Sequence, residues 1–266
     1  MGKPALSIRG LSTSFYLKNR TVKALDGVDM DLYAGRITAL VGGSGSGKSV
    51  LSLSILGLIE KPGKVVTGSV MLEDRDLLAL SEGELRRVRG EKIAMIFQEP
   101  ANSLNPVIKV KDHLFEVNRL GSRRLKKQDA LALFQDVLSR VGLRDAPKIL
   151  ESYPFELSGG MCQRIMVAMG LLAHSSVLIA DEPTSSLDLT TQAAILKELA
   201  RLRDTGISIL LVTHDLGVVA QMADDVYVIK DGRIVEQGTV YEVFERPRHE
   251  YTKLLLEKTE GTDGIN

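Results

Sequence analysis

The chain has 266 residues, 44% of them hydrophobic, which is enough for one large α/β domain or for a core with a smaller subdomain. Lys plus Arg and Asp plus Glu number 34 each, so the balanced charge argues against nucleic acid or an acidic lipid surface as a partner. The one cysteine, Cys162, excludes an internal disulfide and a cysteine-held iron–sulfur cluster, and the four histidines lack metal-ligand spacing.

No apolar run approaches the ~18 residues of a membrane span, and the N-terminus lacks the apolar segment of a signal peptide. We therefore expect a cytoplasmic protein whose contact with a membrane comes through partners. The densest basic cluster is expected to be a solvated helix start and comprises Arg123, Arg124, Lys126 and Lys127.

Short strands separated by turns occupy the N-terminal part of the chain. Turn signals at Asp26-Gly27 and Ala34-Gly35 divide this part. The expected strands are Ala5–Leu11, Val22–Leu32 and Ile37–Val41. A further pair of strands is expected around Gly68–Leu72 and Lys92–Phe97.

A glycine-rich segment follows the strand Ile37–Val41 and precedes a helix expected over Val50–Leu58; it reads Gly42-Gly43-Ser44-Gly45-Ser46-Gly47-Lys48-Ser49. It fits the phosphate-binding pattern G-x-x-x-x-G-K-[ST], the P-loop. Its glycines allow backbone N–H groups to turn toward a triphosphate, and the helix N-terminus adds its dipole. Lys48 is expected to reach the β- and γ-phosphates, and Ser49 to ligate Mg²⁺. The segment predicts that the protein binds a nucleoside triphosphate.

Beyond residue 110 the pattern becomes helical and then alternates. Helical periodicity covers Asp129–Val141 and Met161–Leu172. The elements expected after these are the strand Val177–Ala180, the helix Thr191–Arg203, the strand Ile207–Val212, the helix Leu216–Met222 and the strand Val226–Ile229. Alternation of this kind indicates a parallel sheet with helices on both faces.

Together these elements predict an α/β fold: a P-loop NTPase core with an N-terminal antiparallel β subdomain and an inserted α-helical subdomain. The core with its β subdomain is expected over residues 1–98 and 173–240. The helical subdomain is expected over 99–172, and a helical tail over 241–266 with a frayed end at Gly261–Asn266.

Two acids end the apolar strand Val177–Ala180. A P-loop needs a carboxylate at the end of a neighbouring strand to hold Mg²⁺, and Asp181 is placed correctly for it. Glu182 points differently and is the natural acceptor of a proton from an attacking water. We therefore expect the chain to hydrolyse the nucleotide it binds.

A second candidate anion site is Leu157-Ser158-Gly159-Gly160, directly before a helix. Ser158 suits the N-cap position, and the two glycines allow a large anion to approach the helix start closely. The apolar residues that follow, Met161, Ile165 and Met169, are expected in the core. Two such sites in a chain with one P-loop suggest ATP held between two chains.

The ordered set of motifs resembles an ABC transporter ATPase subunit over nearly the whole chain. The set comprises the P-loop, Gln98, Leu157-Ser158-Gly159-Gly160, Asp181-Glu182, Ser186-Leu187-Asp188 and His214. The resemblance implies that Gln98 reaches Mg²⁺ and senses a membrane partner. It also implies that Ser158 and Gly160, in the segment containing Gly159, contact the γ-phosphate of ATP held by the opposite subunit.

The same resemblance assigns three further residues. Asp188 would shape the dimer seam near the hydrolytic water. His214 would contact the γ-phosphate and position water together with Glu182. Phe15 is the best match for the aromatic residue that stacks on adenine, with Tyr16 as the alternative.

Three segments resemble the oligopeptide/dipeptide/nickel importer branch of this family: Ile96–Pro100, Asn102–Pro106 and Tyr153–Met161. The branch implies a heterodimer with a second, homologous ATPase subunit arranged head to tail. It also implies two membrane-spanning permease subunits, an extracytoplasmic substrate-binding protein acting indirectly, and a peripheral location on the cytoplasmic face of the cell membrane. No nucleic-acid partner is expected.

Two details favour nickel or a metal chelate as the cargo. Gly43 stands where peptide importers usually have Glu, and the tail after Tyr251 is short and free of cysteine. Import of a dipeptide or oligopeptide is the alternative. A soluble ABC-type assembly ATPase without transport is a further alternative, and Glu182 and His214 argue against a binding module without catalysis.

Overall fold

The structure is a computed structural model that describes residues 2–99, 103–120, 125–185 and 187–260, with the side chains of 258–260 excepted. It divides into two compact units, Met1–Leu85 with Ser208–Asn266, and Arg86–Ile207. Sequence features that lie outside the described residues are Pro100–Asn102, Arg123, Arg124, Ser186 and the tail Gly261–Asn266. The expected division into nucleotide-binding core, helical subdomain and tail stays a prediction.

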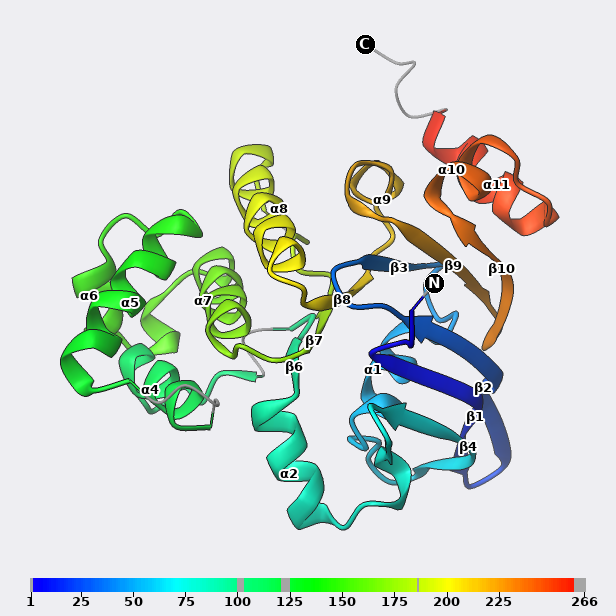
Figure 1. The fold of residues 1–266 in the computed structure, drawn as a ribbon, viewed down its shortest axis with the longest axis horizontal. Coiled ribbons are helices and arrows are strands. Elements are labelled where there is room, and N and C mark those ends of the chain that lie inside the picture. The colour runs from blue at the N-terminus through cyan, green and yellow to red at the C-terminus, as the bar shows by residue number, and fades with distance from the viewer. Residues whose placement is uncertain (1, 100–102, 121–124, 186, 261–266) are drawn as a thin grey trace. The chain divides into compact units, whose positions relative to one another are not determined.

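An antiparallel four-stranded sheet lies in the first unit, in the order β2-β1-β4-β5 (Figure 1). Its strands are β1 (Leu6–Leu17), β2 (Arg20–Leu32), β4 (Gly63–Leu72) and β5 (Arg75–Asp76), followed by the 3₁₀ helix η1 (Leu77–Ala79). This confirms the expected antiparallel β subdomain. β1 extends six residues beyond the predicted Leu11, because its pairing with β2 continues as far as Leu17 opposite Arg20. Ser12, Thr13 and Ser14 are buried but polar, so hydrophobic periodicity does not detect this part of the strand.

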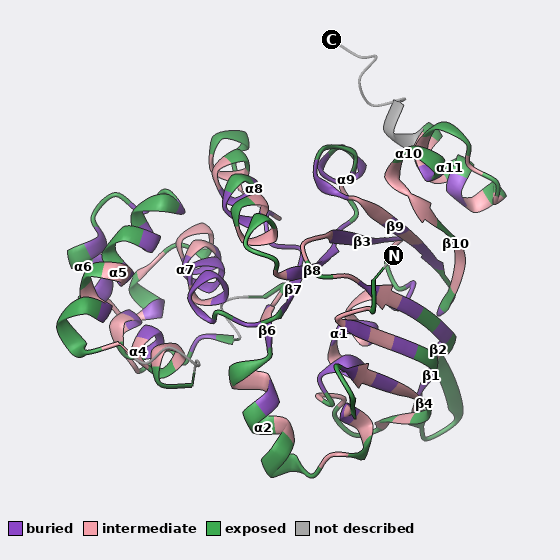
Figure 2. Ribbon diagram, viewed as in Figure 1, coloured by how far each residue is buried: buried purple, intermediate pink, exposed green. Residues whose placement is uncertain are grey.

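The first unit also contains a mainly parallel layer. Its elements are β3 (Ile37–Val41), α1 (Lys48–Ile55), β8 (Ser208–Val212), α9 (Leu216–Met222), β9 (Asp225–Lys230) and β10 (Arg233–Thr239). β3 lies between β8 and β9 and is parallel to both, and β10 is antiparallel to β9 at the edge. Every residue of β3 and β8 is buried (Figure 2). These continuous apolar runs are typical of parallel strands covered on both faces.

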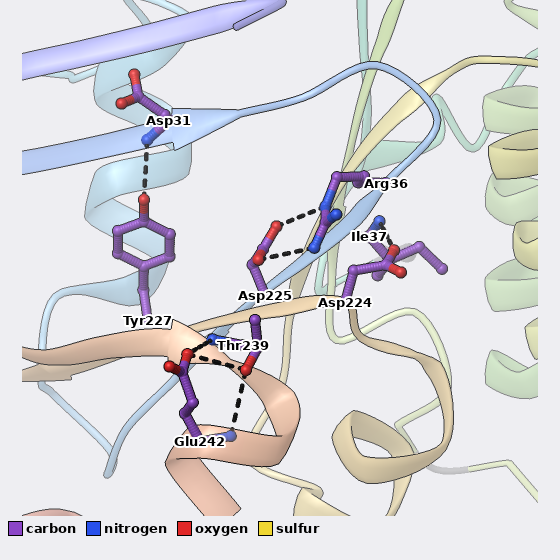
Figure 3. Close-up of polar contacts among 8 residues, drawn as sticks. All are labelled: Asp31, Arg36, Ile37, Asp224, Asp225, Tyr227, Thr239 and Glu242. Atoms are coloured by element: carbon purple, nitrogen blue, oxygen red, sulfur yellow. Dashed lines mark hydrogen bonds and ion pairs between the residues drawn. The ribbon is translucent and has the colours of Figure 1, made fainter. Parts of the chain in front are cut away.

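Polar contacts fix the beginning of β3 (Figure 3). The Asp224 carboxylate accepts the Ile37 N–H at 2.8 Å, and Arg36 donates two hydrogen bonds to Asp225 at 2.8 and 2.9 Å. The Tyr227 hydroxyl accepts the N–H of Asp31 at 3.2 Å, which joins β9 to β2. β3 is therefore anchored where it begins, and the glycine-rich loop follows where it ends.

Two helices after β10 pack on the same layer. They are α10 (Val240–Glu245) and α11 (Glu250–Glu260), and they lie beside β10 in Figure 1. Thr239 caps α10, and its hydroxyl and backbone N–H both donate to the Glu242 carboxylate at 2.9 Å (Figure 3). Val243 is buried in a cluster with residues of β3 and β9, and Tyr251 packs against that cluster. The C-terminal helices are therefore part of the first unit's core.

The second unit contains two parallel strands and a group of helices. α2 (Glu82–Glu91) enters it from the first unit, and the other elements are β6 (Ile93–Ile96), α4 (Val110–Leu120), α5 (Lys127–Arg140), α6 (Ala146–Glu151), η2 (Pro154–Glu156), α7 (Gly159–Leu172), β7 (Val177–Asp181) and α8 (Leu189–Asp204). α7 packs against α4 and α5, as Figure 1 shows. No helix in the described ranges is long and apolar enough to cross a membrane.

The two strands predicted as a pair, around Gly68–Leu72 and Lys92–Phe97, both exist but belong to different sheets. β4 pairs with β1 in the antiparallel sheet, whereas β6 pairs with β7 in parallel. β6 is mostly buried, and its partner β7 is buried along its whole length. A short apolar run cannot indicate which of two sheets it joins.

Candidate functional site

The P-loop, residues Gly42–Ser49, joins the buried strand β3 to α1. Gly45 and Gly47 have φ of +74° and +109°, in the left-handed region that favours glycine. A Cβ on Gly42 would lie 2.3 Å from the Ile229 carbonyl oxygen, and one on Gly47 would lie 2.7 Å from that of Ala24. The loop can therefore follow this path only with glycine at these positions. The resulting backbone turns directly into the N-terminus of α1.

Positive charge gathers where α1 begins. The Lys48 ammonium donates to the carbonyls of Gly42 and Gly43 at 2.8 and 3.0 Å. The first turn of α1 contains no acidic residue, so the helix dipole and Lys48 act in the same sense. Ser44 is exposed, Ser49 is half-buried, and the buried Ser46 hydroxyl has no hydrogen-bond partner among the residues described. Such a cradle suits a phosphate chain.

His214 lies at the same edge of the sheet as the P-loop. β3 and β8 are parallel, with Leu40 opposite Val212. The P-loop follows Val41, and His214 stands two residues beyond Val212. Both therefore project from the carboxyl ends of adjacent strands, where ligands bind in open α/β sheets. The His214 side chain is exposed.

Phe15 lies on β1 and is half-buried. It stands opposite Val22 on β2 and Gly63 on β4, and a Cβ on Gly63 would lie 2.7 Å from the Phe15 ring. The ring therefore packs over a glycine that leaves room for it. Tyr16, the alternative for stacking on adenine, is 52% exposed.

In the second unit, Asp181 and Glu182 stand where β7 ends. Both are buried, at 2% and 7% exposure. β6 runs parallel to β7 with Ile96 opposite Ala180, so Gln98 follows the neighbouring strand at the same edge, with an exposed side chain. The structure thus brings Gln98 and the two acids to one edge of this strand pair. Gln98 and Asp181 are the predicted Mg²⁺ ligands and Glu182 is the predicted proton acceptor, and these roles stay predictions.

Glu182 has φ +50°, a left-handed conformation that is uncommon for glutamate. Its carbonyl accepts hydrogen bonds from the Gln163 side-chain amide at 3.3 Å and from the Ser185 hydroxyl at 3.0 Å. The Gln163 amide also donates to the Pro183 carbonyl at 3.2 Å. Sequence reasoning missed Gln163, and the available signal was a glutamine among the apolar residues of α7, where it is 3% exposed.

Ser158 is the N-cap of α7, as predicted, and its hydroxyl accepts the Met161 N–H at 3.3 Å. Apart from its chain neighbours and the backbone of α7 itself, no described atom lies within 4 Å of where a Cβ on Gly159 would be, and one on Gly160 would lie 3.5 Å from Leu187. The backbone at this helix start is therefore open to a large anion on the Gly159 side. The predicted core face is also present in part, since Ile165 is fully buried.

Asp188 is the N-cap of α8. Its carboxylate accepts the Thr191 hydroxyl at 2.7 Å and the Thr191 N–H at 3.0 Å. The bond from the Thr191 hydroxyl contributes most, followed by that from its N–H, and together they hold the pKa of Asp188 below its usual value. The carboxylate therefore has a capping role within the chain, which the sequence analysis did not consider.

No group of three or more His, Cys, Asp or Glu that could hold a metal occurs in the part of the chain that the structure describes. The predicted magnesium ligands are instead the Ser49 hydroxyl, the Asp181 carboxylate and the Gln98 amide oxygen. All three ligands donate through oxygen, and the protein supplies only these three predicted ligands. This donor set fits Mg²⁺, which keeps several waters and takes further ligands from phosphates.

A contact that sequence reasoning missed joins the P-loop to the C-terminal helices. The Tyr251 hydroxyl, from α11, accepts the N–H of Gly43 at 2.8 Å. The two residues are 208 positions apart, and no local pattern signals such a pairing.

The chain is similar in sequence to known ATP-binding transport proteins. Residues 25–185 match the family described as ABC transporter. The oligopeptide transport ATP-binding protein AppD of Bacillus subtilis (strain 168) is 44% identical over 97% of this chain and 79% of its own length. The dipeptide transport ATP-binding protein DppD of the same organism is 46% identical, over 94% and 75%.

Solved structures agree on the fold. The dimeric post-hydrolysis state of the ATP-binding cassette MJ0796 bound to ADP and Pi has a TM-score of 0.80 at 24% identity, covering 88% of this chain and 98% of that one. CbiO1 from Clostridium perfringens, part of the ABC transporter complex cbiONQ, has a TM-score of 0.73 at 27% identity, covering 99% and 100%. The fold and the P-loop define an ATP-hydrolysing cassette. The chain belongs to the ABC transporter family.

Proposed function

We propose that this chain is the ATP-hydrolysing subunit of an ABC importer for peptides. The observation that carries the proposal is 44% identity to AppD across 97% of the chain. Putative peptide import proteins of Brucella are also 47% identical over 96% of it. These relatives support the alternative expectation, a dipeptide or oligopeptide cargo, and give no support to nickel or a metal chelate.

Gly43, which favoured nickel in the sequence, has another physical explanation. A Cβ at this position would lie 3.0 Å from the Tyr251 hydroxyl oxygen, closer than side chains usually pack. Packing against Tyr251 therefore gives a reason for a small residue here that does not involve the cargo. The argument from Gly43 to nickel loses its force.

The proposed reaction is hydrolysis of ATP. The P-loop would bind the phosphates, and Ser49, Gln98 and Asp181 would hold Mg²⁺, which neutralises phosphate charge when bound. The Lys48 ammonium would stabilise the charge that develops on the γ-phosphate. Glu182 would accept a proton from the attacking water, and His214 would orient that water. Phe15 would stack on the adenine.

The proposed partners complete the site and give it a task. A second, homologous ATPase subunit would place its ATP against Ser158, Gly159 and Gly160, with Asp188 near the seam. The open backbone at Gly159 and the dimeric structure of the cassette MJ0796 support this arrangement. Two membrane-spanning permease subunits and, indirectly, a substrate-binding protein would place the chain peripherally on the cytoplasmic face of the membrane. The transport names of the relatives favour this over a soluble assembly ATPase.

The test is uptake by the native cell with this chain replaced by its Glu182→Gln form. A labelled dipeptide, a labelled oligopeptide and labelled nickel are followed side by side. Loss of peptide uptake with normal nickel uptake supports the proposal. Loss of nickel uptake alone overturns the cargo, and no change in any uptake overturns transport. Glu245→Gln, at an exposed glutamate on α10, is the matched control.

A further inference from the structure

Gly43 is held from both sides by groups of the first unit. Its N–H donates to the Tyr251 hydroxyl at 2.8 Å, and its carbonyl accepts from the Lys48 ammonium at 3.0 Å. Tyr251 is itself half-buried, and the ammonium of Lys230, at the end of β9, lies 5.0 Å from its ring centroid. A cation at this distance from an aromatic ring is attracted to it. The position of Tyr251 is therefore coupled to that of Lys48 through a single residue.

We propose that Tyr251 is a positioning residue for the P-loop lysine, acting through Gly43. The proposal deepens the proposed function, on which it rests, because it concerns how Lys48 is presented to the nucleotide. Tyr251 fixes the Gly43 peptide, and the Gly43 carbonyl helps to fix the Lys48 ammonium. In this way the C-terminal segment contributes to nucleotide affinity.

A second set of contacts holds Tyr251 in place. The Glu236 carboxylate, on β10, accepts the N–H groups of Arg248 and His249 at 2.7 and 3.0 Å. The His249 ring nitrogen Nδ1 in turn accepts the N–H of Tyr251 at 3.1 Å. Burial raises the pKa of Glu236, but the hydrogen bonds it accepts outweigh burial and hold that pKa below its usual value. The beginning of α11 is thus tied to β10 by a charged carboxylate.

The absence of a side chain at residue 43 fits this contact closely. A Cβ there would lie 3.0 Å from the Tyr251 hydroxyl oxygen, so the hydroxyl or the loop would have to shift. Gly43 does not have a left-handed φ, so alanine is acceptable to the backbone at this position. An alanine at residue 43 therefore tests the contact and not the backbone conformation.

The experiment measures ATP hydrolysis by the full-length chain in its complete transporter, as a function of ATP concentration. Tyr251→Phe keeps the ring and removes the hydroxyl, and we expect KM for ATP to rise about three- to tenfold, the value of one hydrogen bond. kcat is expected to fall by a smaller factor than KM rises, because Lys48 contacts the phosphates in the ground state as well as in the transition state. Tyr241→Phe, at an exposed tyrosine on α10, is the control.

A double-mutant cycle decides whether the effect passes through Gly43. Gly43→Ala is expected to raise KM in the wild-type chain, because its Cβ displaces the hydroxyl. In the Tyr251→Phe chain the hydroxyl is gone, so the same change should cost much less. The KM of the double variant should then be no higher than that of the worse single variant.

Three outcomes would overturn the positioning role. The first is an unchanged KM in Tyr251→Phe, and the second is a fall in its kcat with KM unchanged. The third is a double variant whose KM rises by the product of the two single-variant factors. Should the Tyr251→Phe chain fail to fold, Glu236→Gln loosens the beginning of α11 and is expected to raise KM in the same direction. An unchanged KM in that variant also overturns the role. A wild-type transporter that hydrolyses no ATP would instead count against the proposed function.

Discussion

Gln163 offers the sharpest test of how Glu182 is held. Its side-chain amide donates to the carbonyls of Glu182 and Pro183 from the buried face of α7. Gln163→Met removes both hydrogen bonds and preserves the length of the side chain and the preference for helix. The variant therefore keeps the carboxylate of Glu182 and removes only the hydrogen bonds that hold the backbone at Glu182 and Pro183.

The magnitude follows from the two carbonyls. Glu182 keeps the hydrogen bond from the Ser185 hydroxyl, so the main loss falls on the buried Pro183 carbonyl, at about 1–3 kcal/mol. A left-handed conformation at a residue such as Glu182 costs about 1–3 kcal/mol and persists only where its surroundings enforce it. The energy lost with the Gln163 hydrogen bonds is similar to the energy that the left-handed conformation costs. Without Gln163, Glu182 is therefore expected to leave its left-handed conformation. Because 1.4 kcal/mol is tenfold in rate, we expect kcat to fall about tenfold or more.

The assay is steady-state ATP hydrolysis by the assembled transporter, with thermal unfolding of each variant measured in parallel. KM for ATP should change little, since the hydrogen bonds of the Gln163 amide go to Glu182, the proposed proton acceptor, and to Pro183. Gln135→Met, at an exposed position of α5, is the control and should match wild type. A kcat within twofold of wild type in a folded Gln163→Met chain would refute the reasoning.

Glu182→Gln should bind ATP and release almost no phosphate, because the amide cannot accept the proton; filter binding and phosphate release measure the two, and normal turnover would remove Glu182 from its role. Arg140→Met should lower the free energy of unfolding by about 1–3 kcal/mol, because the buried Glu198 loses one of the two arginines that pair with it among the described residues, and urea titration measures this. Glu236→Gln should destabilise the chain most at neutral pH. The pKa of Glu236 is lowered by folding, so its contribution is present above the unfolded pKa of about 4.3 and is lost as pH falls through the folded value; a pH-independent difference would contradict this.

The nucleotide-binding segment could be predicted from the sequence because its signals are local. The strand Ile37–Val41 has the predicted bounds, and the glycines at 42 and 47, which the motif specifies, lie where a Cβ would clash with backbone carbonyls. Asp181 could be assigned because it ends an apolar strand, whereas His214 was assigned only through the family resemblance, and the roles of both stay predictions. The antiparallel subdomain was also predictable, although periodicity ended β1 too early.

Contacts between distant segments could not be predicted in this way. Tyr251 reaches the P-loop across 208 residues, and the register of β6 with β7 depends on a pairing partner that periodicity does not identify. The transported cargo could not be predicted from the sequence for another reason. Gly43 was interpreted as a mark of cargo, whereas its environment is a tyrosine hydroxyl, and a residue that packs inside the chain carries no information about what a membrane partner transports.

The backbone conformation of Glu182 could not be predicted from local sequence, because distant contacts maintain it. Its Cβ disfavours a positive φ, and the proline that follows it favours an extended conformation, so local rules predict strand-like backbone here. The observed φ of +50° is maintained by Gln163, 19 residues earlier in the chain, and by Ser185. Two local preferences oppose this conformation, so tertiary contacts must enforce it. Glu182 is also the proposed proton acceptor. Any change that weakens those contacts should therefore affect turnover before it affects nucleotide binding.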